Sequence, residues 1–266
     1  MPDQPSSQYF ERLGALGSAV YSCIEVSHNC EGILSPTSRH FYASVLFTVL
    51  CTRGVSLATV APYSKWAERL IEHWDFSSIA VLTRSILEIR IAFFYLCIEE
   101  CSIEEWGCRW NLFNLHDCIS RIRLFKLMET GTQDIIGFEA AAEELRVRLS
   151  SNSFFMNLTE KKRNRFIKGR YAYLHPLGDI AVRAGVKQQI FPWIYHLLSS
   201  HVHGLPMSFY RMGDSERGRG VHSEVEENYT SLCLSLCTSL LVKSRDEMKR
   251  LFEGVHNDKD CNVIPH

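Results

Sequence analysis

The chain has a long central stretch without proline, and this feature constrains the fold most strongly. No proline occurs between Pro62 and Pro176, and glycine is sparse in the same stretch. Proline and glycine are the residues that most often interrupt helices. Apolar residues here recur at helical spacing, and no alternating pattern bounded by turn residues predicts a strand. The sequence therefore predicts an all-α protein.

Helical spacing predicts a series of helices along the whole chain. They cover about residues 6–28, 38–60, 76–100, 102–129, 133–149, 158–168, 178–185, 189–203 and 222–253. We expect a single domain over residues 1–266 with a core at about 38–203. Its central antiparallel bundle would contain the helices near 38–60, 76–100, 102–129 and 189–203. The C-terminal helix would close this bundle, and the extra short helices would cover one end.

The composition predicts a soluble protein of the cytoplasm. Hydrophobic residues make up 46% and charged residues 22%, and the formal net charge of -1 gives no overall attraction to nucleic acid or membranes. The N-terminus lacks the features of a signal peptide, and apolar runs such as 91–98 are shorter than the ~20 residues of a membrane span. We therefore expect no membrane contact. The ten cysteines include no CxxC pair, so we expect them to be reduced residues of the core.

The predicted helix at 76–100 carries a charged pair within an apolar sequence. Asp75 precedes it as a candidate N-cap. Arg84 and Glu88 are four residues apart and therefore share one face of the helix. The pair is either a structural salt bridge that fixes the packing of the helix or the floor of a polar pocket. Arg90 is expected at the solvent edge.

Two other helices carry charged residues in a regular arrangement. In the helix at 102–129, Arg109 and Arg121 belong to the polar side, opposite the side that carries the tryptophans. In the helix at 222–253, acidic residues lie at the start and basic residues near the end, which matches the helix dipole. The acidic residues are Glu224, Glu226 and Glu227.

Polar side chains form a second constellation at Tyr195, Ser199 and His203. Their i, i+4, i+8 spacing places them on one strip of the helix at 189–203. His203 lies at the helix end, where a histidine serves either as a cap or as a catalytic group.

Neither a metal nor a cofactor is predicted. His196, His201 and His203 do not show the i, i+4 spacing of helical zinc ligands, and no carboxylate interrupts them. The long irregular segment 204–221 follows. Its arginines, Arg211 among them, either bind an anion or belong to a solvated loop.

The two polar motifs resemble those of a bacterial helical family of unknown function. Members share Arg-Ser-x-x-Glu and, later, Tyr-x-x-x-Ser-x-x-x-His-Gly. The matching residues here are Arg84, Ser85, Glu88, Tyr195, Ser199, His203 and Gly204. This family is distantly similar to HEPN-type four-helix bundles, which include nucleotide-binding proteins and metal-independent ribonucleases of toxin and phage-defence systems. Those ribonucleases carry Arg-x(4–6)-His, a spacing present at Arg170–His175 and Arg217–His222.

The resemblance implies a homo-oligomer, expected to be a dimer, with RNA or a nucleotide as partner. Two functional hypotheses follow. In the favoured one, the polar cluster of Arg84, Glu88, Tyr195, Ser199 and His203 is structural, and the protein is a binding or interaction module. The alternative is a metal-independent ribonuclease or phosphodiesterase. His203 would then be the general acid/base and Arg84 the phosphate clamp, oriented by Glu88, with Tyr195, Ser199 and Arg211 binding the substrate.

Overall fold

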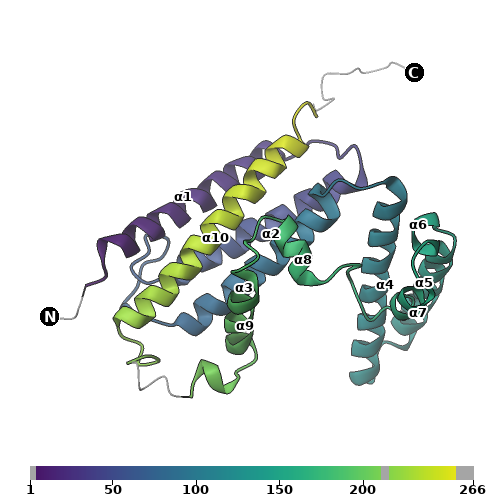
Figure 1. Ribbon diagram of the computed structural model, residues 1–266. Helices are drawn as coiled ribbons and strands as arrows, with labels where there is room; N and C mark the ends of the chain where they lie inside the picture. Colours follow the sequence, from purple (N-terminus) through teal and green to yellow (C-terminus); the bar gives the residue numbers. More distant parts are fainter. Residues whose placement is uncertain (1–3, 211–215, 256–266) are drawn as a thin grey trace. The chain divides into compact units, whose positions relative to one another are not determined.

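The computed structural model describes residues 4–210 and 216–255, and all regular structure in these residues is helical (Figure 1). The long helices are α1 (Ser7–Asn29), α2 (Ser38–Val60), α3 (Phe76–Phe93), α4 (Ile103–Leu127), α5 (Thr132–Ser150) and α10 (Glu224–Leu251). The shorter ones are α6 (Ser153–Met156), α7 (Glu160–Phe166), α8 (Leu177–Arg183) and α9 (Phe191–Val202). A π-helical segment, Phe94–Ile98, extends α3, and a 3-10 turn, Pro206–Ser208, follows α9. The predicted all-α fold is confirmed.

Side-chain caps define where several of the long helices begin. The oxygens of Ser6, Ser102 and Ser223 accept hydrogen bonds from backbone N–H groups in the first turns of α1, α4 and α10. Asp75 accepts one from the N–H of Ser78, so the predicted N-cap of α3 is confirmed. These bonds satisfy N–H groups that have no partner within the helix.

The chain divides into two compact units. One contains the described residues up to Ile98 and from Ala181 onward, and the other contains Glu99–Ile180. The expectation of a single domain over 1–266 stays a prediction.

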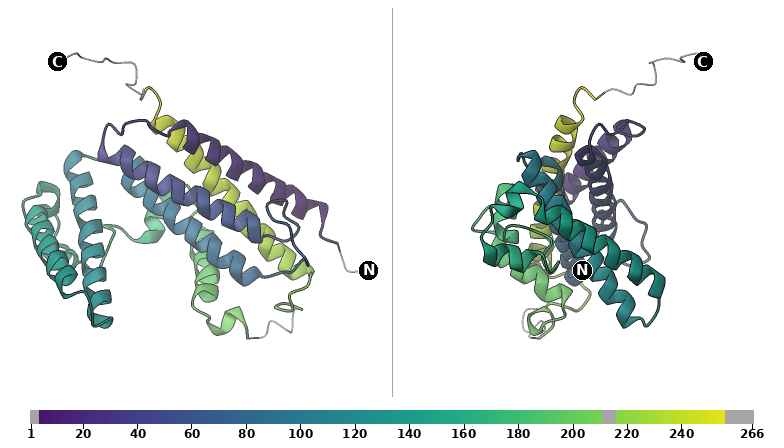
Figure 2. Two further views of the ribbon diagram at one scale, coloured as in Figure 1. Left: turned by 180° about the vertical axis from the view of Figure 1, so that it is seen from behind. Right: turned by 90° about the vertical axis from the view of Figure 1, so that its right-hand side faces the viewer.

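The first unit is a bundle of α1, α2, α3 and α10, which lie side by side in Figures 1 and 2. The bundle is not purely antiparallel: α1, α3 and α10 run in one direction, as the Arg90–Glu247 pair shows for α3 and α10, and α2 runs in the other, with His40 bonded to Leu251. α9 packs against α3. At Gly54 on α2, a Cβ atom would lie 3.1 Å from Val20 of α1 and 3.3 Å from Leu241 of α10. The missing side chain at Gly54 therefore lets three helices approach closely in the middle of the bundle.

The second unit is built on the pair α4 and α5. Its core joins one face of α4 to residues of α5, α6 and α7: Cys108, Leu112, Leu115, Cys118, Ala142, Leu149, Phe155 and Phe166. The central bundle thus differs from the expected one, because α4 packs on α5 and α1 takes part in the bundle instead. α1 fills that place with a completely buried stripe that includes Leu16, Val20 and Cys23.

One described helix, α2, is long and apolar enough to cross a membrane by length and composition alone. A buried bundle helix can have the same composition, and α2 contributes Phe47, Leu50 and Leu57 to the core. The expectation that the protein does not contact membranes stays a prediction.

Candidate functional site

α3 presents Arg84 and Glu88 toward α9. The Nε and Nη2 atoms of Arg84 donate hydrogen bonds to one carboxylate oxygen of Glu88, at 2.9 and 2.8 Å. The Arg84 side chain is 11% exposed, whereas that of Glu88 is 45% exposed. The pair is therefore not sealed in the core, because its carboxylate reaches solvent.

α9 brings Tyr195 and Ser199 onto this pair. The Arg84 guanidinium lies 3.6 Å from the centre of the Tyr195 ring, and its Nη1 atom donates to the hydroxyl of Ser199. That hydroxyl donates in turn to the carbonyl of Tyr195, at 2.6 Å. The phenol of Tyr195 donates to Glu88, at 3.3 Å. We call these four residues the α3–α9 cluster.

The phenol of Tyr195 acts as a donor in this cluster. Burial raises its pKa, and the negative charge of Glu88 adds to the rise, although the positive charge of Arg84 opposes it. Tyr195 therefore stays protonated at neutral pH and does not act as a base there.

His203 lies apart from these hydrogen bonds. It is the exposed C-cap residue of α9. In the part of the chain that the structure describes, no side-chain hydrogen bond or ion pair joins His203 to Arg84 or Glu88. Arg211, the other expected ligand of an anion, lies outside the described residues. The structure thus unites Arg84, Glu88, Tyr195 and Ser199, and their roles in any reaction stay predictions.

Arg90, expected at the solvent edge, lies in the core instead. Its side chain is completely buried and forms a two-pronged ion pair with Glu247 of α10, at 2.5 and 2.8 Å. It also donates to the carbonyl of Ala184, at 2.9 Å. Arg90 therefore ties α3, α10 and the segment after α8 together.

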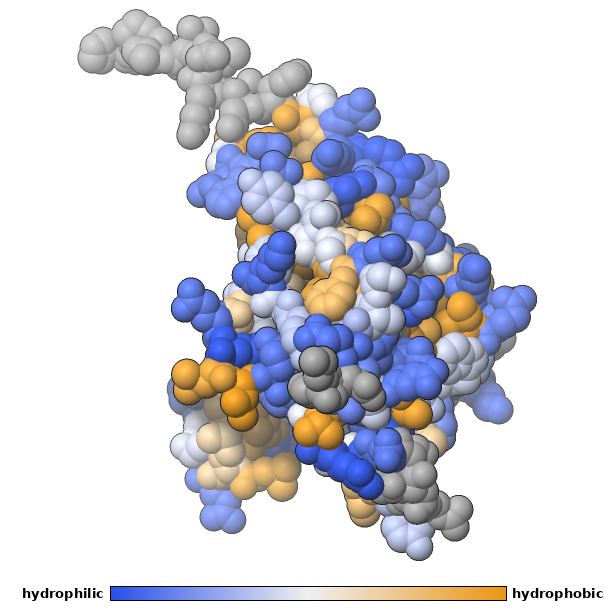
Figure 3. Space-filling model, turned by 90° about the vertical axis from the view of Figure 1, so that its left-hand side faces the viewer, coloured by the Kyte–Doolittle hydropathy of each residue, from blue (hydrophilic) through white to orange (hydrophobic). Residues whose placement is uncertain are grey.

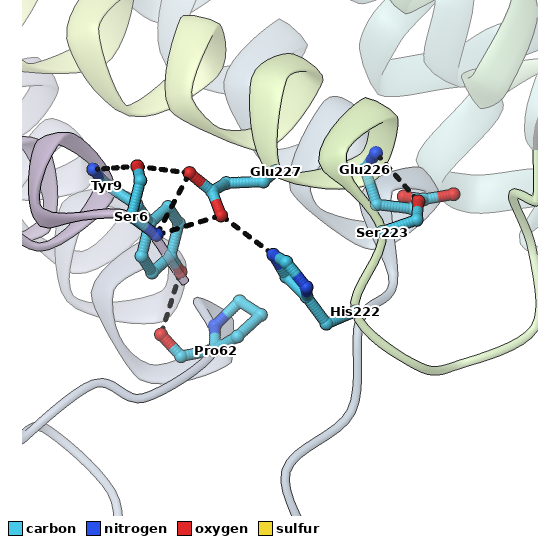
Figure 4. Close-up of polar contacts among 7 residues, drawn as sticks. All are labelled: Ser6, Tyr9, Pro62, His222, Ser223, Glu226 and Glu227. Carbon is cyan, nitrogen blue, oxygen red and sulfur yellow. Dashed lines mark hydrogen bonds and ion pairs between the residues drawn. The ribbon is translucent and has the colours of Figure 1, made fainter. Parts of the chain in front are cut away.

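A further polar cluster, missed in the sequence analysis, fastens the start of α1 to the start of α10 (Figure 4). Glu227 accepts hydrogen bonds from the N–H and the hydroxyl of Ser6, and its second oxygen lies 2.7 Å from Nε2 of His222. Ser6 bonds to the carboxylate rather than to the histidine, so this is not the order of a nucleophilic triad. Glu226 and Glu227 are 2% and 8% exposed. They share a face of α10 with Thr230, which is also buried. Their acidic character hid this burial from a reading of the sequence.

His201 is buried beside this region, on the strip of α9 next to that of Ser199. Its Nδ1 atom lies 3.0 Å from the hydroxyl of Ser77, and its ring meets Phe76 edge-on. Burial lowers the pKa of His201, and the positive charge of Arg217 lowers it further, while Asp75 opposes the shift. Folding therefore favours the neutral form of this histidine.

The buried His201 should make the protein lose stability in mild acid. The unfolded chain binds this proton first, so the free energy of unfolding should fall as the pH drops below about 6.5. Replacing His201 by glutamine should flatten the stability–pH profile by up to ~1.4 kcal/mol per pH unit. Urea midpoints measured between pH 7 and pH 5 would reveal the change. His203→Gln, an exposed change on the same helix, is the matched control and should keep the wild-type slope.

Metal and thiol chemistry find no support in the described residues. No group of three or more His, Cys, Asp or Glu side chains there could hold a metal ion. The cysteines in the described part form no disulfide, and burial raises the pKa of Cys51 to about 11 and of Cys97 to about 12. Such thiols stay protonated and act as small apolar residues.

An all-helical protein with a polar cluster between two packed helices is the class that fold and site define. Residues 63–220 match the model of a family of unknown function, DUF5677. This match covers more than half of the chain, so the protein belongs to that family. The matched region includes α3 and α9 and hence the whole α3–α9 cluster. No curated protein and no solved structure matches the chain.

Proposed function

We propose that this protein is a non-catalytic binding module that holds single-stranded RNA at the end of α9. The carrying observation is that all three guanidinium nitrogens of Arg84 donate within the protein, to Glu88 and Ser199. An arginine whose three nitrogens each bond within the protein, and whose charge is paired with a carboxylate, is a poor phosphate clamp. The cluster instead fixes α9 on α3, which supports a structural role.

The segment that α9 carries supplies the proposed contact surface. On the face shown in Figure 3 most side chains are hydrophilic, with apolar groups exposed between them. Directly after α9, Phe209 and Tyr210 are 61% and 65% exposed, and Leu205 and Met207 are nearly half exposed. Exposed aromatic rings stack with unpaired bases, with little dependence on sequence. His203 lies beside this segment and offers a ring that donates or accepts hydrogen bonds.

Fluorescence polarisation of a dye-labelled single-stranded RNA tests this proposal. Replacing both Phe209 and Tyr210 by alanine should weaken binding roughly tenfold or more, since stacking contributes about 1–3 kcal/mol per base. Tyr21, exposed to the same degree on α1, gives the control. Tyr21→Ala should bind RNA as the wild type does. Equal affinity of the double variant and the wild type would contradict the proposed surface.

The same samples separate this proposal from the ribonuclease hypothesis. RNA incubated with the wild-type protein should stay intact, and so should RNA incubated with the double variant. Cutting by the wild type that His203→Ala abolishes would reverse the conclusion in favour of a metal-independent ribonuclease, with His203 as its acid/base group.

A further inference from the structure

A groove lies between α1, α9 and α10, on a different strip of α9 from the α3–α9 cluster. Its lining includes Arg12 of α1, Trp193 of α9, and Val225, Asn228, Tyr229 and Leu232 of α10. All three helices belong to the first unit. The lining is mainly apolar, with polar groups from a few residues, which is the usual character of a ligand site.

The floor of the groove is a second apolar strip on α10. Val225, Tyr229 and Leu232 follow one another at i, i+4 and i+7 and are each partly exposed. The bundle core uses another strip of the same helix, which includes Cys233 and Cys237. The floor strip is therefore apolar without being needed to close the bundle.

The ring of the tyrosine in this floor is held in place by two neighbouring side chains. The Tyr229 ring packs against Phe76, with 5.2 Å between the two ring centres. The guanidinium of Arg217 lies 4.5 Å from the centre of the Tyr229 ring. A ring fixed in this way is a preformed surface for a flat ligand, because little side-chain freedom is lost on binding.

The two walls differ in chemistry. Trp193 is 46% exposed and offers an indole to the groove. Arg12 is partly buried, and in the described part of the chain no carboxylate or other side-chain partner meets its guanidinium. A cation that lines a groove without a paired carboxylate favours an anion, since charge-assisted hydrogen bonds are among the stronger polar contacts.

We propose that this groove binds a small aromatic anion, a flat ring that carries a negatively charged group. The ring lies on the floor at Tyr229, beside Trp193, and the anionic group meets Arg12. The amide of Asn228, at the exposed edge, both donates and accepts hydrogen bonds and so suits a polar ring edge. A neutral apolar ligand would form no charge-assisted bond with Arg12, and a cation would be repelled by it. The site is separate from the proposed RNA contact at Phe209 and Tyr210.

Isothermal titration calorimetry with five probes tests the required chemistry. Adenosine monophosphate and indole-3-acetate each combine a ring with an anion, whereas adenosine and indole have only the ring and inorganic phosphate only the anion. At least one of the first two should bind saturably, and about tenfold or more tighter than its neutral counterpart and than phosphate. If only one of them binds, it identifies the combination of ring and anion that the groove accepts. No saturable binding of either at millimolar concentration would overturn the proposal.

Variants assign the binding to this groove. Arg12→Gln should lower the affinity for the aromatic anion about tenfold and leave the affinity for the neutral ring unchanged. Trp193→Ala should weaken both. Arg53→Gln, an exposed arginine on α2, is the control and should bind as the wild type does. Unchanged binding in Arg12→Gln would contradict the proposal, with circular dichroism confirming that each variant is folded. The double variant of Phe209 and Tyr210 should retain this binding, which keeps the result separate from the RNA test.

Discussion

Replacing Arg90 by methionine should lower the free energy of unfolding by about 3–5 kcal/mol. The arginine is completely buried, and its two-pronged pair with Glu247 supplies the counter-charge for that burial, beside the bond to Ala184. Its loss leaves the carboxylate of Glu247, only 12% exposed, without a counter-charge. It also removes the donor that meets the carbonyl of Ala184.

Chemical denaturation of three variants isolates this effect. The double variant Arg90→Met with Glu247→Leu should recover much of the loss, because two apolar side chains can replace a buried ion pair at little cost. Arg219, which pairs with Glu216 in an exposed position, gives the control in the same unit. Arg219→Met should change stability by less than about 1 kcal/mol. A single Arg90 variant as stable as this control would show that the buried pair does not stabilise the fold.

Arg90 also marks a limit of local sequence patterns. The helix α3 is apolar all round, and this pattern correctly predicts that most of its sides are covered. It does not tell which charged residue points into the core and which reaches solvent. The partner of Arg90 lies 157 residues away in the chain, so no local spacing reveals the pair. Arg84 and Glu88 are four residues apart, and their contact was therefore predictable from spacing alone.

Helix positions followed from the sequence more closely than helix partners did. The predicted and observed bounds of α2 coincide, and those of α1 and α4 differ by only one or two residues at each end. Helical periodicity and caps are local properties, so one sequence carries them. The replacement of α4 by α1 in the bundle depends on how apolar faces match in three dimensions. The short helix α6 was missed because four residues carry too little periodicity to detect.

The same limit applies to the candidate site. Spacing predicted that Tyr195 and Ser199 share a strip of α9, and the structure shows this strip against Arg84. It did not predict that His203, one turn further, lies exposed at the helix end without a bond to the pair. The strip of Tyr195, Ser199 and His203 runs to the end of α9, but α3 covers only the part of it that carries Tyr195 and Ser199.

Arg109 gives the second large expected effect, in the unit formed by Glu99–Ile180. Its place on the helix predicts the polar side of α4, but its side chain is only 4% exposed. It donates to Glu105 at 2.6 and 3.0 Å and to Glu99 at 2.6 Å. Replacing Arg109 by methionine leaves two poorly exposed carboxylates close together without their shared counter-charge. We expect a loss of about 3–5 kcal/mol in this unit.

Amide hydrogen exchange within Glu99–Ile180 measures the expected loss of stability in this unit. Arg109→Met should accelerate exchange in the core of α4 and α5. Arg121 supplies a matched control, because it was assigned to the same polar side of α4 and pairs with Asp117, four residues earlier, while both side chains are 52% exposed. Arg121→Met should change the opening free energy by no more than about 0.5 kcal/mol. Arg109→Lys should fall between the two, since an ammonium group cannot reproduce the planar contacts to both carboxylates. Equal exchange in Arg109→Met and Arg121→Met would mean that burial of the guanidinium contributes nothing, and that the polar side of α4 is uniform, as its sequence suggests.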